Sequence, residues 1–297
     1  MHHRNRFIAA FSATLACSAF SAALAQQTPP ATVTVSGIVR DFKERTVPGG
    51  HPDFEKRPAE GFGHYCKNIE EELGSNGKPE YNSCGFKVQK QWKTSGGKNI
   101  CWLLYDDDLG DIRGEKDGGS PDGGFQSEST FDKLWKDDLA LNTSAPLNLT
   151  LGREANGLYV FDSNTTPEYM SLGGFFPIDG QLFGNSPGTP AHNYHFTYEL
   201  HVRFVYDADG PQILPFRSDD ALWVFVNGMN VIDLGGVHTA LDQEVHLNRL
   251  GLVDGQEYSI HIFYAERHRP SSSLKITLPL PANSTPPQPP TVTAGYD

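Results

Sequence analysis

Alternating apolar and polar positions in the second half of the chain predict long β-strands. In residues 194–206, YHFTYELHVRFVY, apolar or aromatic side chains occupy every second position and mostly polar side chains lie between them. Consecutive side chains of a strand point to opposite faces, so this period of two predicts a strand with one buried face. Residues 257–267 and 274–278 alternate in the same way.

A tight hairpin is predicted where the run LWVFV, residues 222–226, meets Asn227-Gly228 and the following segment NVIDLGG. The two central residues of a primed turn need positive φ, which Asn and Gly tolerate best. Because Trp223 and Phe225 alternate with aliphatic residues, we expect both to be core residues and not a platform for stacking sugars.

The first half is less regular. We predict strands at 32–42, 146–152 and 158–163, a short helix at 131–139, and a loop-rich insert at about 60–130. Many short strands with turns between them indicate an all-β fold. The predicted architecture is an antiparallel β-sandwich with a loop-rich N-terminal elaboration and one short helix.

The two ends of the chain differ from this pattern. Residues 1–25 have a basic start, an apolar stretch and a small-residue cleavage sequence, which is typical of a secretory signal peptide. A retained anchor and a lipoprotein that uses Cys17 are the alternatives. Residues 281–297 are rich in Pro and polar residues and are expected to be a disordered tail, which leaves one domain at 31–280.

The negative net charge of the chain argues against polyanionic partners. Loss of the two arginines in residues 1–25 changes the formal charge from −12 to −14. Phosphate binding needs concentrated Lys and Arg, so nucleic acids and anionic membranes are poor partners. No other stretch has the length of apolar residues needed to span a membrane, so we expect no insertion after signal cleavage.

Three cysteines would remain in a secreted chain: Cys66, Cys84 and Cys101. In an oxidising compartment an odd number predicts one bridge and one free or intermolecular thiol. Three pairings are possible, and a Cys66–Cys84 bridge that closes a polar loop is our preferred one.

The sequence contains no familiar catalytic signature, neither a nucleophile elbow, a phosphate-binding loop, a His-Glu-x-x-His helix nor a Cys-x-x-Cys pair. The acidic, glycine-rich residues 106–124 do not have the spacing of an EF-hand, and we interpret them as a solvated loop. Polar residues at strand ends are the better candidates: Asp219-Asp220, Asp233, His238 and the run 266–268. Charged residues beside turns also often do no more than face water.

Eight motifs in series resemble the fibro-slime family over roughly residues 32–280. They are VSGIVRDF, HPDFEK, LGSNGKPEY, FFPIDGQLFG, NYHFTYELHVRFVY, SDDALWVFVNG, VIDLGGVH and GLVDGQEYSIHIFYAERH. That family is similar to the protective-antigen-like lectin domain of flocculins and adhesins, a β-sandwich. The resemblance implies that Asp219 and Asp220 form a cis-linked pair that binds Ca²⁺, which in turn binds vicinal sugar hydroxyls. Two carboxylates suit Ca²⁺, which prefers oxygen ligands.

The resemblance also implies that the loop after the strand ending near residue 266 completes the site. Glu266 is the candidate third metal ligand, and Arg267, His268 and Ser271 are candidate ligand-binding residues. A salt bridge from Arg267 to Glu266 or Asp233 is an equally good interpretation of these charges.

Asp233 and His238 lie in the family pattern and are also candidate ligand-binding residues, although a hydrogen-bonded structural role is the favoured interpretation of His238. Family members often have a third acid where this chain has Ala221, and Ser-Asn-Phe where it has Ser272-Ser273-Leu274. The identity of the sugar therefore cannot be transferred.

These observations predict a secreted or cell-surface, non-catalytic, calcium-dependent protein that binds a glycan or polysaccharide. The first alternative is a matrix protein with a purely structural Ca²⁺. The second is a glycoside hydrolase, which needs two carboxylates placed about 5–10 Å apart to divide proton transfer between them.

Overall fold

The computed structural model describes residues 28–117 and 123–280. Most of the secondary structure is antiparallel β-strand, as predicted. The strands are β1 Thr32–Phe42, β2 Gly63–Cys66, β3 Ile69–Leu73, β4 Pro79–Tyr81, β5 Phe86–Lys90, β6 Glu115–Lys116, β7 Asn142–Arg153, β8 Tyr159–Asp162, β9 Phe196–Val205, β10 Ile213–Asp219, β11 Ala221–Val226, β12 Met229–Val237, β13 Leu241–His246, β14 Glu257–Glu266 and β15 Ser273–Leu278. The helices are α1 Glu128–Asp132 and α2 Pro167–Leu172, with 3₁₀ turns η1 Trp102–Leu104, η2 Asp107–Leu109, η3 Lys133–Trp135 and η4 Leu247–Arg249.

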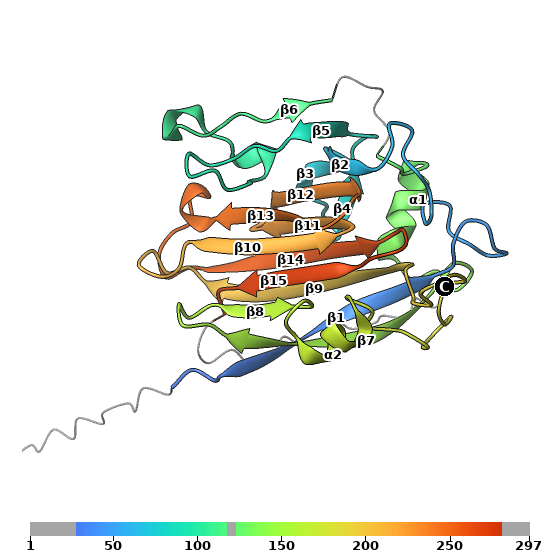
Figure 1. Cartoon of the computed structure of the whole chain (residues 1–297). Coiled ribbons are helices and arrows are strands. Elements are labelled where there is room, and N and C mark those ends of the chain that lie inside the picture. The colour runs from blue at the N-terminus through green and yellow to red at the C-terminus, as the bar shows by residue number, and fades with distance from the viewer. Residues whose placement is uncertain (1–27, 118–122, 281–297) are drawn as a thin grey trace, which may run out of the picture.

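The strands form two packed layers. One layer has the order β13-β10-β15-β8-β7 and the other the order β1-β9-β14-β11-β12. The long β1 pairs with β7 along its whole length and with β9 over residues 38–41, so it joins the layers at one side. Figure 1 shows β10, β15 and β8 in front of β9 and β14. This arrangement is the predicted β-sandwich.

Both faces of β11 are buried, in two different cores. Leu222, Val224 and Val226 belong to the main core between the layers. Trp223 and Phe225 belong to a second core, built with aromatic residues from the segment around α1 and η3. The prediction that both aromatic residues are core residues is confirmed.

The segment around α1 and η3 also explains why the outer face of β9 is less exposed than the alternation predicted. Residues 201, 203 and 205 are exposed as expected, but Thr197 and Glu199 are buried. The Thr197 hydroxyl donates a 2.9 Å hydrogen bond to the carbonyl of Leu134 in η3. A period of two therefore identified the strand but not the segment that covers its outer face.

The predicted hairpin joins β11 to β12. Asn227 and Gly228 have φ values of 51° and 82°, the positive values that a primed turn requires. The predicted helix at 131–139 is also present, shifted toward the N-terminus as α1 followed by η3.

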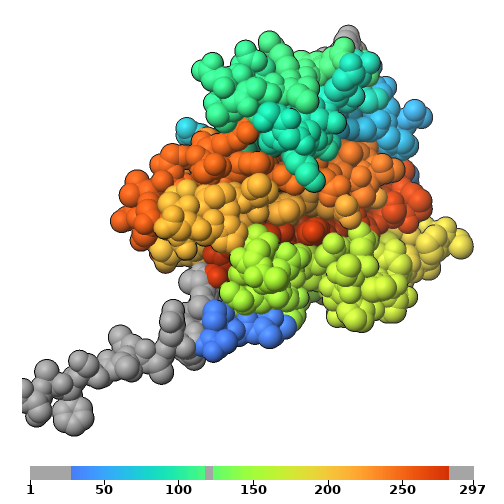
Figure 2. Space-filling model, turned by 60° about the vertical axis from the view of Figure 1, so that its left-hand side comes forward, coloured from blue at the N-terminus to red at the C-terminus, as the bar shows by residue number. Residues whose placement is uncertain are grey.

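The insert at about 60–130 contains more structure than predicted. Strand β2 extends the second layer by pairing with β12 at Gly235–Val237, and β5 and β6 follow outward from it. Figure 2 shows this segment, cyan to green, along one edge of the sandwich above the orange strands. The insert is thus positioned beside the end of β12.

The predicted Cys66–Cys84 bridge is wrong for this structure, in which Cys66, Cys84 and Cys101 are all free. The Sγ of Cys66 is buried 3.3 Å from Nε2 of His64, whereas the Sγ of Cys84 lies 3.4 Å from the hydroxyl of Tyr81. Cys66 is buried, whereas Cys84 is partly exposed, so the two thiols have different neighbours.

The predicted signal peptide at 1–25 and tail at 281–297 lie outside the described residues. Within residues 28–117 and 123–280, none of the helices has both the length and the apolar character required to cross a bilayer.

Candidate functional site

Three connections between the two layers meet at one end of the sandwich. Asp219-Asp220 carries the chain from β10 to β11, residues 238–240 carry it from β12 to β13, and residues 267–272 carry it from β14 to β15. A cis peptide bond joins Asp219 to Asp220, as predicted. The three crossings are distant in sequence, and the sandwich brings them together.

Asp219 is the most accessible acid of the group. It is 6% exposed, and its Oδ2 accepts a 2.8 Å hydrogen bond from the hydroxyl of Ser271, an exposed residue of the neighbouring crossing. Burial raises the pKa of Asp219 to about 6, despite the hydrogen bonds from Ser271 and the backbone of Ala240. Ser271 therefore lies beside the acidic pair, and its predicted contact with a ligand stays a prediction.

Asp220 is 1% exposed and holds two of the crossings through backbone N–H groups. Its Oδ1 accepts from the N–H of His238 at 2.8 Å, and its Oδ2 accepts from the N–H of Arg267 at 3.2 Å. Burial, followed by the charge of Asp219, raises the pKa of Asp220 well above its ordinary value.

Glu266 is completely buried beside the pair, and its Oε1 has no hydrogen-bond partner among the described residues. Its Oε2 lies 2.8 Å from the hydroxyl of Tyr264, which also contacts the carbonyl of Asp219 and, at 2.9 Å, the hydroxyl of Ser272. Ser272 donates its own hydrogen to the carbonyl of Phe175. One tyrosine hydrogen therefore faces three oxygens and can be donated to only one of them at a time.

The charges around these acids favour a bound proton or cation. None of the salt bridges among the described residues involves Asp219, Asp220 or Glu266. Burial, then the charges of Asp220 and Asp219, raise the pKa of Glu266 well above its usual value. The positive charge of Arg267 lowers the pKa of Asp220 but does not offset its burial. Buried carboxylates that lack an ion pair either take up protons or hold a metal. Carboxylate, carbonyl and hydroxyl oxygens are the ligand types that Ca²⁺ prefers. The ligand atoms of Asp219, Asp220 and Glu266 do not all lie within 4.8 Å of one another among the described residues, so an ion would have to draw them closer together.

His238 supports the site through its backbone, and its ring is held by the protein. Nδ1 lies 3.0 Å from the carbonyl of Thr239 and Nε2 lies 3.1 Å from the carbonyl of Leu234. Burial lowers the pKa of the ring, against the opposite effect of the two carbonyls. These hydrogen bonds agree with the favoured structural interpretation of His238, and a contact of its ring with a ligand stays a prediction.

Arg267 is also an internal anchor. Its side chain is fully buried, stacks on the ring of Phe125 at 3.9 Å, and donates to the carbonyls of Gly124 at 2.6 Å and Asp53 at 3.2 Å. The guanidinium thereby ties the insert to the crossing after β14. This placement corrects the sequence-based assignment of Arg267 as a ligand-binding residue.

Asp233 lies away from the acidic cluster and is 2% exposed. Its carboxylate accepts hydrogen bonds from the indoles of Trp102 at 3.0 Å and Trp223 at 3.2 Å, and from the N–H of Lys67 at 2.8 Å. Burial raises its pKa to about 6. The structure therefore assigns Asp233 to the junction of the insert with β12, and the predicted contact with ligand is corrected.

His268 remains at the surface of the crossing, with its Nε2 3.1 Å from Oε2 of Glu55 and its ring 4.7 Å from that of Phe62. Glu44, Glu55 and His195 form a separate group whose potential ligand atoms lie within 4.8 Å of one another. Arg269 forms ion pairs with both glutamates of that group. The carboxylates of this group therefore have a cation in direct contact.

Sequence reasoning missed the polar role of Tyr264, which its strand pattern assigns to the core. It also missed Ser272, Phe62 and His64 as neighbours of the site. The alternation of β14 indicated that Tyr264 points inward, but no local pattern indicated that its hydroxyl would meet a buried glutamate.

Comparisons with known proteins match the part of the chain that contains this site. A model of the PA14 domain matches residues 155–291, a range that contains the Asp pair and all three crossings. The chain is similar to three proteins of Dictyostelium discoideum. It is 38% identical to protein psiD over 50% of this chain, 36% identical to protein psiC over 51%, and 39% identical to protein psiI over 44%.

The aligned regions cover 29% of psiD, 29% of psiC and 17% of psiI, so the chain matches less than a third of each of these relatives. Among solved structures, 28% of this chain is similar to 10% of a beta-glucosidase from Kluyveromyces marxianus in complex with glucose, at 17% identity and a TM-score of 0.21. A likeness of that size carries no argument about fold or function.

Proposed function

We propose that this chain is a secreted or cell-surface, non-catalytic protein of the fibro-slime type that binds carbohydrate through Ca²⁺. Asp219, Asp220 and Glu266 would hold the ion. When bound, Ca²⁺ supplies open coordination positions for two neighbouring hydroxyls of a sugar. The observation that carries the proposal is the buried Glu266, with one oxygen unpartnered beside two further buried carboxylates.

The residues of the acidic cluster have different roles in the proposed site. Asp220 fixes two crossings by accepting their backbone N–H groups, and Tyr264 connects Glu266 to the carbonyl of Asp219. Asp219 and the exposed Ser271 form the side nearest to solvent. A ligand would therefore approach from the side of Asp219. The match to the PA14 domain over these residues supports the same proposal.

A structural Ca²⁺ in a matrix protein is the second candidate, and the deep burial of Asp220 and Glu266 favours it. An ion enclosed on every side would stiffen the three crossings without binding sugar. Glycoside hydrolysis fits less well. Its two carboxylates need separate positions and unlike protonation, whereas Asp219 and Asp220 are adjacent and burial raises the pKa values of all three acids.

The test is retention on a glycan array with Ca²⁺ and with chelator. We expect binding that chelator abolishes and that Asp219→Asn abolishes in the presence of Ca²⁺. Asp108→Asn is the matched control, because Asp107 and Asp108 are also adjacent acids but lie exposed in η2. Glycan retention that is equal in wild type, in Asp219→Asn and in chelator would contradict the proposal. Calcium uptake by calorimetry without any glycan retention would select the structural candidate.

A further inference from the structure

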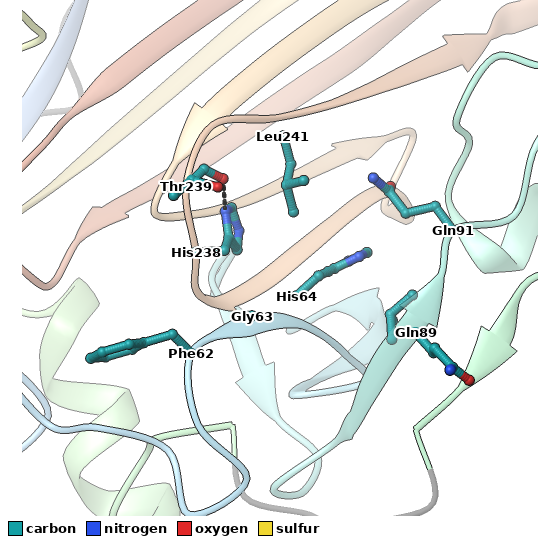
Figure 3. A pocket seen from close by; sticks show the side chains of 9 residues that line it. Phe62, Gly63, His64, Gln89, Gln91, His238, Thr239 and Leu241 are labelled. Atoms are coloured by element: carbon teal, nitrogen blue, oxygen red, sulfur yellow. Dashed lines mark hydrogen bonds between the residues drawn. The ribbon is translucent and has the colours of Figure 1, made fainter.

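A pocket of about 420 Å³ opens beside the acidic cluster, between the insert and the crossing from β12 to β13. Figure 3 shows residues of the insert on one side and the crossing on the other. The volume lies in the range of about 300–1,000 Å³ that is usual for small-molecule sites. The lining residues are Phe62, Gly63, His64, Val88, Gln89, Gln91, His238, Thr239 and Leu241.

The pocket and the acidic cluster share structural parts. His238 lines the pocket with its side chain and donates its backbone N–H to Asp220 at 2.8 Å. The next crossing also reaches the pocket, because the ring of His268 contacts that of Phe62 at 4.7 Å. A ligand group at the cluster and another in the pocket would therefore be neighbours, within reach of one oligosaccharide.

The chemistry of the lining favours an uncharged ligand. The lining has no Lys, Arg, Asp or Glu. His64 directs Nε2 at the carbonyl of Asp233 over 2.6 Å, so that nitrogen carries the hydrogen. Its Nδ1 is a buried acceptor without a partner among the described residues. Burial lowers the pKa of His64 to about 3, which keeps the ring neutral.

The remaining polar and aromatic groups match the two faces of a sugar ring. Phe62 is 47% exposed. The guanidinium of Arg57 lies 5.3 Å from the centre of its ring and the ring of His268 lies 4.7 Å away, so only the remaining exposed part of Phe62 can pack against the C–H face of a pyranose. Gln89 is exposed. Gln91 lies at the opposite end of the pocket from Phe62 (Figure 3). The amide oxygen of Gln91 accepts a 3.1 Å hydrogen bond from Gln243, which fixes the orientation of the Gln91 amide. The amides of Gln89 and Gln91 are groups that can bind sugar hydroxyls.

We propose that this pocket is a second subsite, which takes a neutral pyranose unit adjoining the unit held at Asp219-Asp220. The inference rests on the proposed function and deepens it, because it makes the ligand a neutral oligosaccharide and assigns its selection to the insert. Phe62 and Gln89 are the selecting residues.

The experiment measures dissociation constants by calorimetry in Ca²⁺. The probes are the methyl glycosides of mannose, galactose and glucose, the matching mannobiose, galactobiose and glucobiose isomers, and one disaccharide with a uronic acid. We expect at least one neutral disaccharide to bind about tenfold or more tighter than its monosaccharide. Phe62→Ala and Gln89→Ala should remove that gain and leave monosaccharide binding unchanged. Phe183→Ala, at an exposed phenylalanine that is absent from the lining, is the matched control.

The outcomes separate the two proposals. If Asp219→Asn loses all binding while Phe62→Ala and Gln89→Ala match wild type on every probe, the subsite is wrong and the proposed function stands. If disaccharide binding survives chelator and Asp219→Asn but is lost in Phe62→Ala, the subsite stands and the calcium-dependent function is wrong. Tighter binding of the uronic acid disaccharide would overturn the choice of a neutral ligand. Absence of binding to every probe would overturn both.

Discussion

The hydroxyl of Tyr264 lies 2.8 Å from Oε2 of Glu266, at a point where both side chains are completely buried. The other oxygen of Glu266 has no hydrogen-bond partner among the described residues. Such a carboxylate is costly to keep ionised unless a cation compensates it. Its replacement therefore has opposite consequences for the calcium-free and the calcium-bound protein.

We predict that Glu266→Gln stabilises the calcium-free protein at pH 7.5 by about 1–2 kcal/mol, because a buried charge without an ion pair is removed. The same change should weaken Ca²⁺ binding at least tenfold, because one carboxylate ligand is lost. Urea unfolding with chelator and calcium calorimetry measure the two effects. A Glu266→Gln protein that is destabilised and binds Ca²⁺ as wild type does would contradict the assignment of Glu266.

The stabilising effect of Ca²⁺ should depend on pH. Burial raises the folded-state pKa of Asp219 from 3.8 to about 6, and the pKa values of Asp220 and Glu266 move in the same direction. In the calcium-free protein the stability contributed by these protons is fully present below about pH 4 and is lost as pH rises through 6 and above. Ca²⁺ competes with the same protons, so its affinity should rise over this range.

Thermal unfolding with saturating Ca²⁺ and with chelator at pH 5 and pH 7.5 measures this difference. At a Ca²⁺ concentration about a hundredfold above the dissociation constant, the stabilisation at pH 7.5 should be about 2.7 kcal/mol. In a domain of this size that corresponds to roughly 5 °C or more. The shift should be smaller at pH 5 and unchanged by Asp108→Asn. An equal shift at both pH values would argue against carboxylate ligands.

Asp233 is expected to matter for folding and not for the metal. Asp233→Ala leaves three donors, the N–H of Lys67 and the indoles of Trp102 and Trp223, without their acceptor. We predict a loss of about 3 kcal/mol in the free energy of unfolding, with an unchanged dissociation constant for Ca²⁺ in the folded protein. A large loss of Ca²⁺ affinity without a loss of stability would return Asp233 to the binding site.

The three thiols should react in a definite order. Cys66 and Cys101 are buried, and burial raises the pKa of both thiols well above the ordinary value, whereas Cys84 is partly exposed. In the native protein a thiol reagent should label Cys84 first, and Cys66 and Cys101 only after unfolding. Peptide mapping without reductant checks this order. Recovery of a Cys66–Cys84 peptide pair would restore the predicted bridge.

The candidate site was only partly predictable. The motif SDDALWVFVNG and its family resemblance identified Asp219-Asp220, and the loop after β14 was assigned to the same site from its order in the chain. The internal hydrogen-bond partners of Arg267 and Asp233 could not be predicted from motif or chain order. A charged side chain near a turn has the same local sequence whether it meets water, a ligand or a distant carbonyl, and the partner of Arg267 at Gly124 lies 143 positions away.

The sequence by itself determined which segments are strands, where the β11–β12 hairpin turns, and that the chain folds as a β-sandwich, because alternation and turn chemistry are local properties of the backbone. Tertiary structure alone decided which faces are covered and which acids meet. Thr197 is buried because the segment that contains η3 lies over it, and its hydroxyl donates to the carbonyl of Leu134. Glu266 meets Asp219 because three layer crossings end at one place, and burial there is what sets their charge.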